Sequence, residues 1–297
     1  MFNTLKYYKI WFTVSGLILL FGVISLLTYG LKLGIDFKGG TLTELKFDQS
    51  FDIAKVKEVI DRQKITNYQL QTTESNGLII KTESIEKDKH DQLLISLQKD
   101  VGNFQEIKFD SIGPTVGKEL QKNALYQLLI VSLGIVAYIA YAFRKVPKPV
   151  TSWRFGWSAV IALLHDLLFV LGIFSILGHY KGVEIDSLFV TAMLTVLGFS
   201  VHDTIVVFDR IRENLKIYAG QSMEYIINHS IAQTIVRSLN TSLTVLFVLL
   251  TLLLFGGETI RYFVFALFIG VIVGTYSSIF IASPVLMLWQ NWKNRAR

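Results

Sequence analysis

The sequence predicts an α-helical membrane protein with six transmembrane helices and an extracytoplasmic α+β domain inserted between the first two. Three observations support this: a mean hydropathy of +0.46, an AVILMFWYC fraction of 52%, and six apolar segments of spanning length. About 20 residues rising 1.5 Å each cross a hydrocarbon core of about 30 Å. The expected spans are Ile10 to Tyr29, Ala124 to Phe143, Phe155 to Gly178, Ile185 to Phe208, Leu239 to Phe255 and Tyr262 to Trp289.

The spans divide the chain into three parts. Residues 1–31 form a cytoplasmic N-terminus and the first span, which we expect to be an uncleaved anchor because no small-x-small cleavage site follows it. Residues 32–121 form the inserted domain. Residues 122–297 form a five-helix transmembrane domain, in which residues 209–236 are expected to include a short cytoplasmic amphipathic helix along the membrane surface.

The distribution of charge predicts the orientation in the membrane. The net charge is +6, yet residues 32–121 hold 13 Lys and Arg against 15 Asp and Glu, so the basic excess lies beside the spans. The two short loops after the third and fifth spans contain only two basic residues, Lys181 and Arg261. Both termini are therefore placed in the cytoplasm by the positive-inside rule, and nucleic-acid binding has no support. The basic residues beside the spans are Lys6, Lys9, Arg144, Lys145, Lys148, Arg154, Arg210, Arg212, Lys216, Lys293, Arg295 and Arg297.

The inserted domain shows strand and helix signals in the order β-α-β-β-α-β, which predicts a ferredoxin-like sandwich. Strands are expected at 40–47, 66–73, 77–82 and 105–109, with helical periodicity around 53–60 and 93–97. His90 stands in the charged run EKDKHDQ and is expected on a solvated helix face. Gly39 and Gly40 are expected to form a tight turn, since no phosphate-loop pattern surrounds them. Cysteine is absent, and we predict no cofactor, no metal site and no enzymatic activity.

Charged residues inside apolar runs are the strongest functional signal. Asp203 lies within the fourth span, where a carboxylate costs roughly 2.5 to 3.5 kcal/mol at mid-bilayer. Arg237 opens the fifth span at a similar depth, so a direct or water-mediated pair is expected, and protonation of Asp203 would release the arginine. His202, His165 and Asp166 are further candidates for proton coupling. Arg237 also starts a polar stripe of residues spaced i, i+3, i+4 and i+7, which continues with Asn240, Thr241 and Thr244.

Purely structural interpretations remain open for these residues. The buried charges also fit a static network that orients the helices, and Arg237 also fits a basic flank that snorkels to the interface. Gly270 and Gly274 belong to a small-xxx-small stripe in the sixth span, which favours helix packing. Sodium is an alternative coupling ion, because carboxylate and hydroxyl oxygens are hard ligands.

Five motifs make the chain resemble the SecF family of the bacterial SecD/SecF export complex, within the RND superfamily. They are GIDFKGGT at 34–41, with Gly34, Asp36, Gly39 and Gly40, IGPTVGKEL at 112–120, LHDL at 164–167, LGFSVHDTIVVFDRIREN at 197–214 and RSLNTS at 237–242. The resemblance covers essentially all of the chain. One departure is His202, where the family more commonly has Asn.

This resemblance implies a function at the plasma (bacterial inner) membrane. A chain of this family pairs with SecD and assists the SecYEG translocon, drawing on the proton motive force to export unfolded preproteins after the ATP-driven step, and a YidC-type insertase is a further candidate partner. The family's fourth-span acid and fifth-span arginine map onto Asp203 and Arg237. Two alternatives remain: a non-motor scaffold of the translocon or insertase and, with less support from the small outer domain, an RND-type small-molecule exporter.

Overall fold

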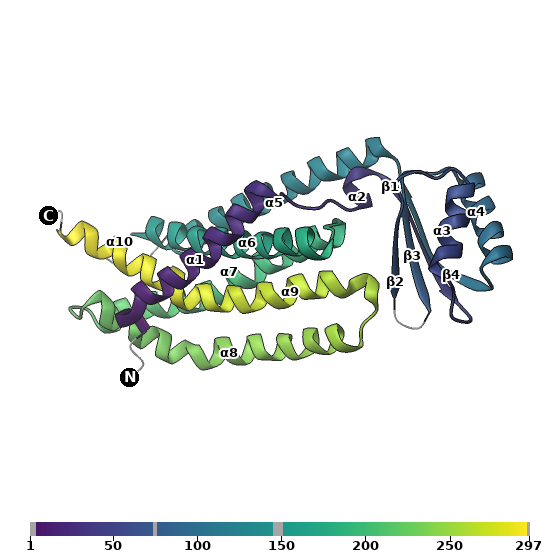
Figure 1. The fold of residues 1–297 in the computed structure, drawn as a ribbon. Coiled ribbons are helices and arrows are strands. Elements are labelled where there is room, and N and C mark those ends of the chain that lie inside the picture. Colours follow the sequence, from purple (N-terminus) through teal and green to yellow (C-terminus); the bar gives the residue numbers. More distant parts are fainter. Residues whose placement is uncertain (1–3, 74–75, 145–150, 296–297) are drawn as a thin grey trace. The chain divides into compact units, whose positions relative to one another are not determined.

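The computed structural model describes residues 4–73, 76–144 and 151–295, and the chain divides into two compact units (Figure 1). One unit comprises Met1–Lys32 and Tyr126–Arg297 and is helical; the other is Leu33–Leu125 and contains the sheet. The expected limits of the inserted domain, 32 and 121, fall slightly earlier, because the first residues of helix α5 (Pro114–Ala142) belong to the sheet unit.

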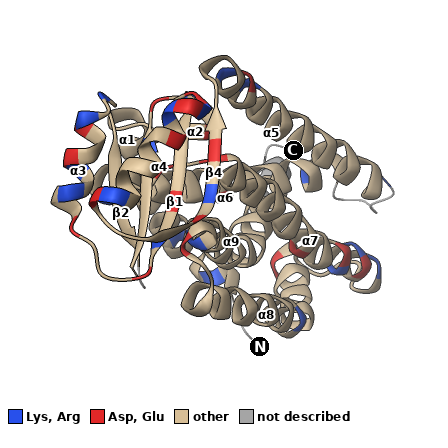
Figure 2. Cartoon of the chain, turned by 90° about the vertical axis from the view of Figure 1, so that its right-hand side faces the viewer, with Lys and Arg blue, Asp and Glu red and all other residues tan. Residues whose placement is uncertain are grey.

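Six helices of the described chain are long and apolar enough to cross a membrane, which confirms the predicted number of spans. The last of them changes helix type along its length, from α9 to the π-helical segment η2 to α10. Charged residues are sparse along α8 and α9 and frequent in the sheet unit (Figure 2). The elements are η1 and α1 (Thr4–Tyr7 and Tyr8–Thr28), α5, α6 (Ser152–Lys181), α7 (Ser187–Ile217), α8 (Met223–Phe255), α9 (Glu258–Ser277), η2 (Ser278–Ala282) and α10 (Ser283–Arg295).

Local sequence fixes several helix ends. Asp186 caps α7 by accepting a hydrogen bond of 2.8 Å from the backbone N–H of Phe189. Ser222 caps α8 in the same way, accepting from Tyr225 N–H at 3.2 Å. Helix α6 ends at Lys181 and is followed by Gly182, which has a left-handed φ of 69° that glycine adopts without strain. These caps satisfy backbone groups that a helix end otherwise leaves without partners.

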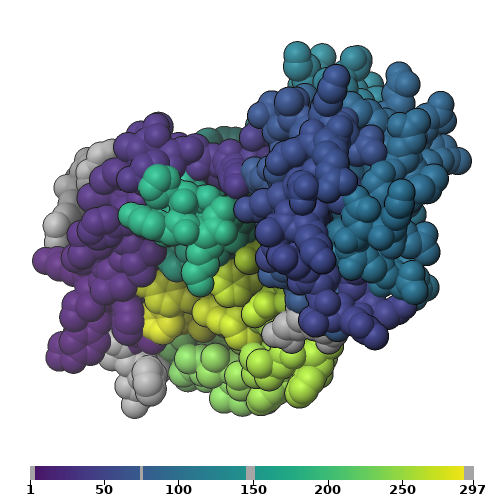
Figure 3. All heavy atoms as spheres, turned by 45° about the vertical axis from the view of Figure 1, so that its right-hand side comes forward, coloured from purple at the N-terminus to yellow at the C-terminus, as the bar shows by residue number. Residues whose placement is uncertain are grey.

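Small residues bring α9 against α7. A Cβ atom at Gly270 would collide with the side chain of Val196, and one at Gly274 would lie 3.0 Å from the Cβ of Ser200. On the face shown in Figure 3, residues of the last span lie between α1 and α8. The two glycines therefore pack against a helix of the same chain, where they set the distance between the spans that carry the buried polar residues.

Enlarging Gly270 should destabilise the helical unit. A Gly270→Leu variant has no space beside Val196, and overpacking of this kind costs about 1 to 3 kcal/mol. We expect a lower melting temperature in detergent and a lower yield of monodisperse protein. Gly16→Leu is the matched control, because nothing lies within 4 Å of a Cβ at that position. Equal melting of both variants would show that the α7–α9 contact is not tight in solution.

The expected separate amphipathic helix within residues 209–236 is wrong. Residues 209–217 continue α7 and residues 223–236 begin α8, so the segment is the end of one long helix and the start of the next. Ile226, Ile227 and Ile231, which gave the amphipathic pattern, are buried in the core of the helical unit. These residues do form one apolar helix face, but that face packs against other helices of the protein.

The sheet unit has the predicted element order. Its four strands are ordered β2-β3-β1-β4, and every neighbouring pair is antiparallel. Helices α3 and α4 share with the strands a core that includes Leu45, Val56, Leu78 and Leu93. The elements are α2 (Ile35–Lys38), β1 (Gly40–Phe47), α3 (Ile53–Arg62), β2 (Gln69–Thr73), β3 (Gly77–Thr82), α4 (Lys87–Asp100) and β4 (Phe104–Ile112).

The motif after the first span forms the entry to this sheet. Gly34 precedes α2, and Asp36 lies within it. Gly39 has a φ of 80°, and a Cβ there would lie 2.7 Å from the Cα of Pro114. At Gly40 a Cβ would lie 2.7 Å from the carbonyl oxygen of Thr82. Both positions therefore require glycine for a tight backbone crossing, in line with the expected turn.

His90 is buried, so the expectation of a solvated position is wrong. Its side chain is 3% exposed, its Nε2 lies 2.9 Å from a carboxylate oxygen of Glu106, and its ring packs 4.0 Å from that of Phe109. His90 shares a helix face with Leu93 and Leu97, three and seven residues further on, and both are buried. The charged neighbours in the sequence obscured this spacing.

Candidate functional site

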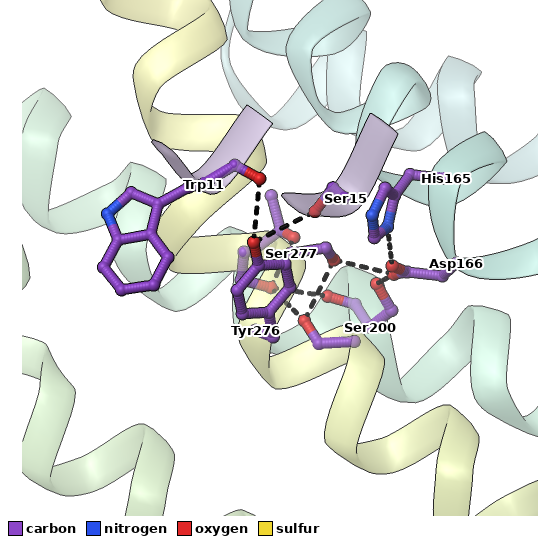
Figure 4. Close-up of polar contacts among 10 residues, drawn as sticks. Trp11, Ser15, His165, Asp166, Ser200, Tyr276 and Ser277 are labelled. Carbon is purple, nitrogen blue, oxygen red and sulfur yellow. Dashed lines mark hydrogen bonds and ion pairs between the residues drawn. The ribbon is translucent and has the colours of Figure 1, made fainter. Parts of the chain in front are cut away.

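Among the described residues of the spans, the most buried charged residue is Asp166 on α6, whose side chain has no exposed surface. Figure 4 shows its contacts with His165, Ser200 and Ser277. Its Oδ2 accepts hydrogen bonds from the hydroxyls of Ser200 at 2.5 Å and Ser277 at 2.8 Å. Its Oδ1 lies 2.9 Å from Nδ1 of the neighbouring His165. Three spans, α6, α7 and α9, thus meet at one carboxylate.

The Asp166 carboxyl group has several hydrogen-bond partners. Three hydrogen-bond partners surround two oxygens, which reduces the cost of removing a carboxylate from water. The hydrogen bonding of His165 is incomplete, because its Nε2 is buried without a hydrogen-bond partner among the described residues. The arrangement holds three helices in one relative position.

Tyr276 extends these contacts to the first span. Its hydroxyl lies 3.2 Å from the backbone oxygen of Trp11, to which it donates, and 2.9 Å from the hydroxyl of Ser15. Its ring lies 6.2 Å from that of His165. Helix α1 is therefore joined to the neighbourhood of Asp166 through a tyrosine that the sequence did not single out.

Asp203 on α7 has a different environment. Its side chain is 6% exposed, and its Oδ2 is buried without a hydrogen-bond partner in the described chain. It borders a small cleft of about 10 Å³, lined by Phe199, His202, Asp203, Val206, Arg237, Ser238 and Thr241. The hydroxyls of Ser238 and Ser278 lie near this carboxylate, although Ser238, like Oδ2 of Asp203, has no hydrogen bond of ordinary geometry among the described residues. Such polar atoms beside a space of about one water molecule form a site that can bind water or hold a proton.

The expected direct ion pair between Asp203 and Arg237 is not formed. Within the residues that the structure describes, no ion pair of 4 Å or less joins these side chains, although both line the same cleft. Arg237 is exposed on the surface of the isolated chain. Of the two predicted arrangements, the water-mediated one fits this geometry.

The predicted polar stripe on α8 faces the cleft only in part. Thr241 lines the cleft, whereas Asn240 and Thr244 are exposed and do not line it. The hydroxyls of Thr241 and Thr244 donate to backbone oxygens one turn earlier. The side of α8 that faces its own bundle carries Ser238 and Ser242 instead.

Sequence reasoning missed the serines that contact the acids. Ser200, Ser277 and Ser278 were not among the residues predicted to contact an acid. The available signal was their position as polar residues inside apolar spans, but serine is common in such helices because its hydroxyl can bond to its own backbone. Among the described residues, no group of three or more His, Cys, Asp or Glu side chains is placed to hold a metal ion.

Comparisons with known proteins agree on one family. Residues 93–292 match the family model for the C-terminal region of the protein export membrane proteins SecD and SecF, and residues 24–50 match the SecD/SecF GG motif. The chain is 47% identical to the protein translocase subunit SecF of Thermobaculum terrenum, over 98% of this chain and 95% of that protein. It is 41% identical to the SecF of Anaerolinea thermophila, over 99% and 96% of the two chains.

The fold is similar to that of a solved protein. The crystal structure of SecDF from Thermus thermophilus matches with a TM-score of 0.84 and 29% identity, over 98% of this chain but only 39% of that one. A second structure, of SecDF in a super-membrane-facing form, matches with a TM-score of 0.72 and 28% identity, over 99% of this chain and 39% of that one. The present chain thus spans about two fifths of the length of the SecDF chains.

Proposed function

Since this chain belongs to the SecF family of protein translocase subunits, we propose that it works with SecD and uses the proton motive force to help draw preproteins across the plasma membrane. The proposed partners are SecD, the SecYEG translocon, a YidC-type insertase and unfolded preprotein. In this proposal the ATP-driven step starts export, and the proton-driven step completes it.

The proposal also fixes an orientation. Both termini lie in the cytoplasm and the sheet unit lies outside, which follows from the basic residues beside the spans. We classify the sheet unit as ferredoxin-like, supported by its β-α-β-β-α-β order and its β2-β3-β1-β4 sheet. An outside sheet unit is available to a polypeptide leaving the translocon.

The observation that carries the proposal is the contrast between the two buried carboxylates. Asp203 has an unpaired oxygen beside a water-sized cleft that Arg237 and His202 also line. A carboxylate in this position can take up a proton from water, and losing its charge changes its attraction to the arginine. We assign Asp203 and Arg237 as the exchange pair, with His202, Asp166 and His165 as accompanying titratable groups.

A non-motor, structural role is the second candidate, and the Asp166 contacts favour it. That carboxylate on α6 is fully buried and hydrogen-bonded to two other helices, α7 and α9, as well as to its neighbour His165, as expected for a static link between spans. A scaffold needs Asp166 but does not need an exchangeable proton at Asp203. The two functions therefore differ in whether a proton gradient speeds the completion of translocation.

The test is completion of translocation in inverted membrane vesicles that contain SecYEG and SecD with or without this chain. ATP is withdrawn after a preprotein has entered, and completion is followed with and without a proton gradient. We expect faster completion only where both the gradient and this chain are present. A gradient effect that does not depend on the chain would leave the scaffold function; replacing the proton gradient by a sodium gradient identifies the coupling ion.

A further inference from the structure

The last span changes from α-helix to π-helix beside the buried acids. Helix α9 ends at Ser277, the π-helical segment η2 covers Ser278–Ala282, and α10 begins at Ser283. Pro284 follows directly; proline has no N–H to donate and disfavours regular helix in the turn before it. The hydroxyl of Ser283 donates to the carbonyl of Ser278, five residues earlier, at 3.0 Å. Ser283 and Pro284 thus account for the π-helical turn at this place.

Two consecutive serines at the start of this turn contact two different helices. Ser277 donates to Oδ2 of Asp166 on α6 at 2.8 Å. Ser278 shares a hydrogen bond of 2.9 Å with the hydroxyl of Thr204 on α7, and its hydroxyl also lies 3.4 Å from the carbonyl of Ser200. Both serines are completely buried. Each hydroxyl also lies within hydrogen-bond distance of the Gly274 carbonyl on its own helix, at 3.1 Å for Ser277 and 2.9 Å for Ser278. The two serines therefore connect the last span to α6 and α7 with no access to solvent.

These contacts connect the two buried carboxylates. Thr204 follows Asp203 in the sequence, and Ser200 lies one turn before it on α7, so Ser278 holds the turn that carries Asp203. Ser200 also donates directly to Asp166 at 2.5 Å. A movement of this turn of α7 would displace the hydrogen-bond partners of Asp166 in two ways. Ser200 would move directly, and Ser278 would move with Thr204 and shift the neighbouring Ser277.

We propose that Ser277 and Ser278 are positioning residues of the coupling machinery, which link the protonation state of Asp203 to the position of the last span against α6. The inference rests on the proposed proton-coupled function. Neutralising Asp203 changes its attraction to Arg237 and shifts the α7 turn; Ser278 moves with Thr204, and Ser277 passes the shift to Asp166. A π-helical turn can absorb such a shift, because its amides can exchange between carbonyls four and five residues earlier.

If the serines link the two carboxylates, removing them should change the pH dependence of transport. Because the serines do not titrate, a change in the pH profile on removing them must come from a changed environment of the acids. The titratable and charged groups around the two carboxylates, from α6, α7, α8 and α9, are His165, His202, Arg237 and Tyr276.

The experiment measures gradient-driven completion against pH in vesicles that contain the full chain with SecD and SecYEG. Ser277→Ala and Ser278→Ala should each lower the rate about ten-fold and move the midpoint of the pH profile, because each leaves a buried polar group without its partner. Ser242→Ala is the matched control: this buried serine bonds to Thr275 at 2.5 Å and to no carboxylate. Its profile should stay at the wild-type midpoint.

A second variant guards against simple loss of folding. Pro284→Ala restores a backbone donor without removing a side-chain hydrogen bond, because the proline ring has no polar atom to donate or accept one, and it should favour a regular helix and displace the two serines. We expect the same movement of the pH midpoint with normal SecD co-purification. Wild-type midpoints in Pro284→Ala and in both serine variants would overturn the inference. If Asp203→Asn still abolished the gradient effect in those vesicles, the proposed function would stand without it.

Discussion

Replacing Asp203 by asparagine should abolish the gradient-dependent part of preprotein completion while leaving the ATP-driven part unchanged. Asparagine keeps the size of the side chain, but it replaces one acceptor oxygen by an N–H₂ group and cannot exchange a proton. The carboxylate has an unpaired oxygen beside the cleft shared with Arg237, so little packing is lost. The measurement is completion in vesicles with and without a gradient, after ATP is withdrawn.

Two controls make the result specific. Asp209→Asn removes a carboxylate six residues further along the same helix. This carboxylate is exposed and paired with Arg212 at 2.5 Å, so the variant should retain the gradient effect. Co-purification of Asp203→Asn with SecD verifies that the variant inserts and assembles. Normal gradient-dependent completion in the Asp203→Asn vesicles would rule out Asp203 as the exchanging group and favour the scaffold function.

Replacing Asp166 by asparagine should mainly destabilise the helical unit. Ser200 and Ser277 both donate to one carboxylate oxygen, and an amide presents only one oxygen, with an N–H₂ group on the other side. Breaking a buried charged network costs about 3 to 5 kcal/mol. For a unit of this size we expect the melting temperature in detergent to fall by roughly 10 °C.

The same variant separates the two roles open to Asp166. If Asp166→Asn melts earlier but completes translocation normally at a lower temperature, Asp166 is a structural link between spans. If it melts like the wild type and loses the gradient effect, Asp166 exchanges protons itself, and its contacts with His165 are part of the proton route. Asp209→Asn again serves as the control, since an exposed surface pair contributes little to stability.

The spans and the order of strands and helices were predictable because their signals are local. A span needs about 20 apolar residues, and strands and helices differ in the period of their apolar positions. Asp203, Asp166 and Arg237 were found for a related reason: a charge in an apolar run stands out without any knowledge of the neighbouring helices. The predicted limits differ from the observed ones mainly where helices extend beyond the apolar core.

The wrong predictions concern the direction in which a helix face points and the residues that pack against it. The pattern of Ile226, Ile227 and Ile231 identified an apolar face but not what covers it, and that face packs inside the protein. Asn240 and Thr244 share a helix face with Arg237, yet they do not line the cleft beside Asp203. His90 was hidden by its charged neighbours, although its spacing to Leu93 and Leu97 carried the signal.

The sequence by itself determined that this chain has six helices long and apolar enough to cross a membrane, carries an inserted sheet domain and holds acids within its apolar segments. Only the tertiary structure decided that Asp166 joins its own span to two others while Asp203 keeps an oxygen without a hydrogen bond of ordinary geometry beside a cleft. The physical reason is that hydropathy and periodicity depend on neighbours along the chain. The partners of a buried polar group come instead from helices far apart in the sequence, and the packing of small residues such as Gly274 against Ser200 brings them together.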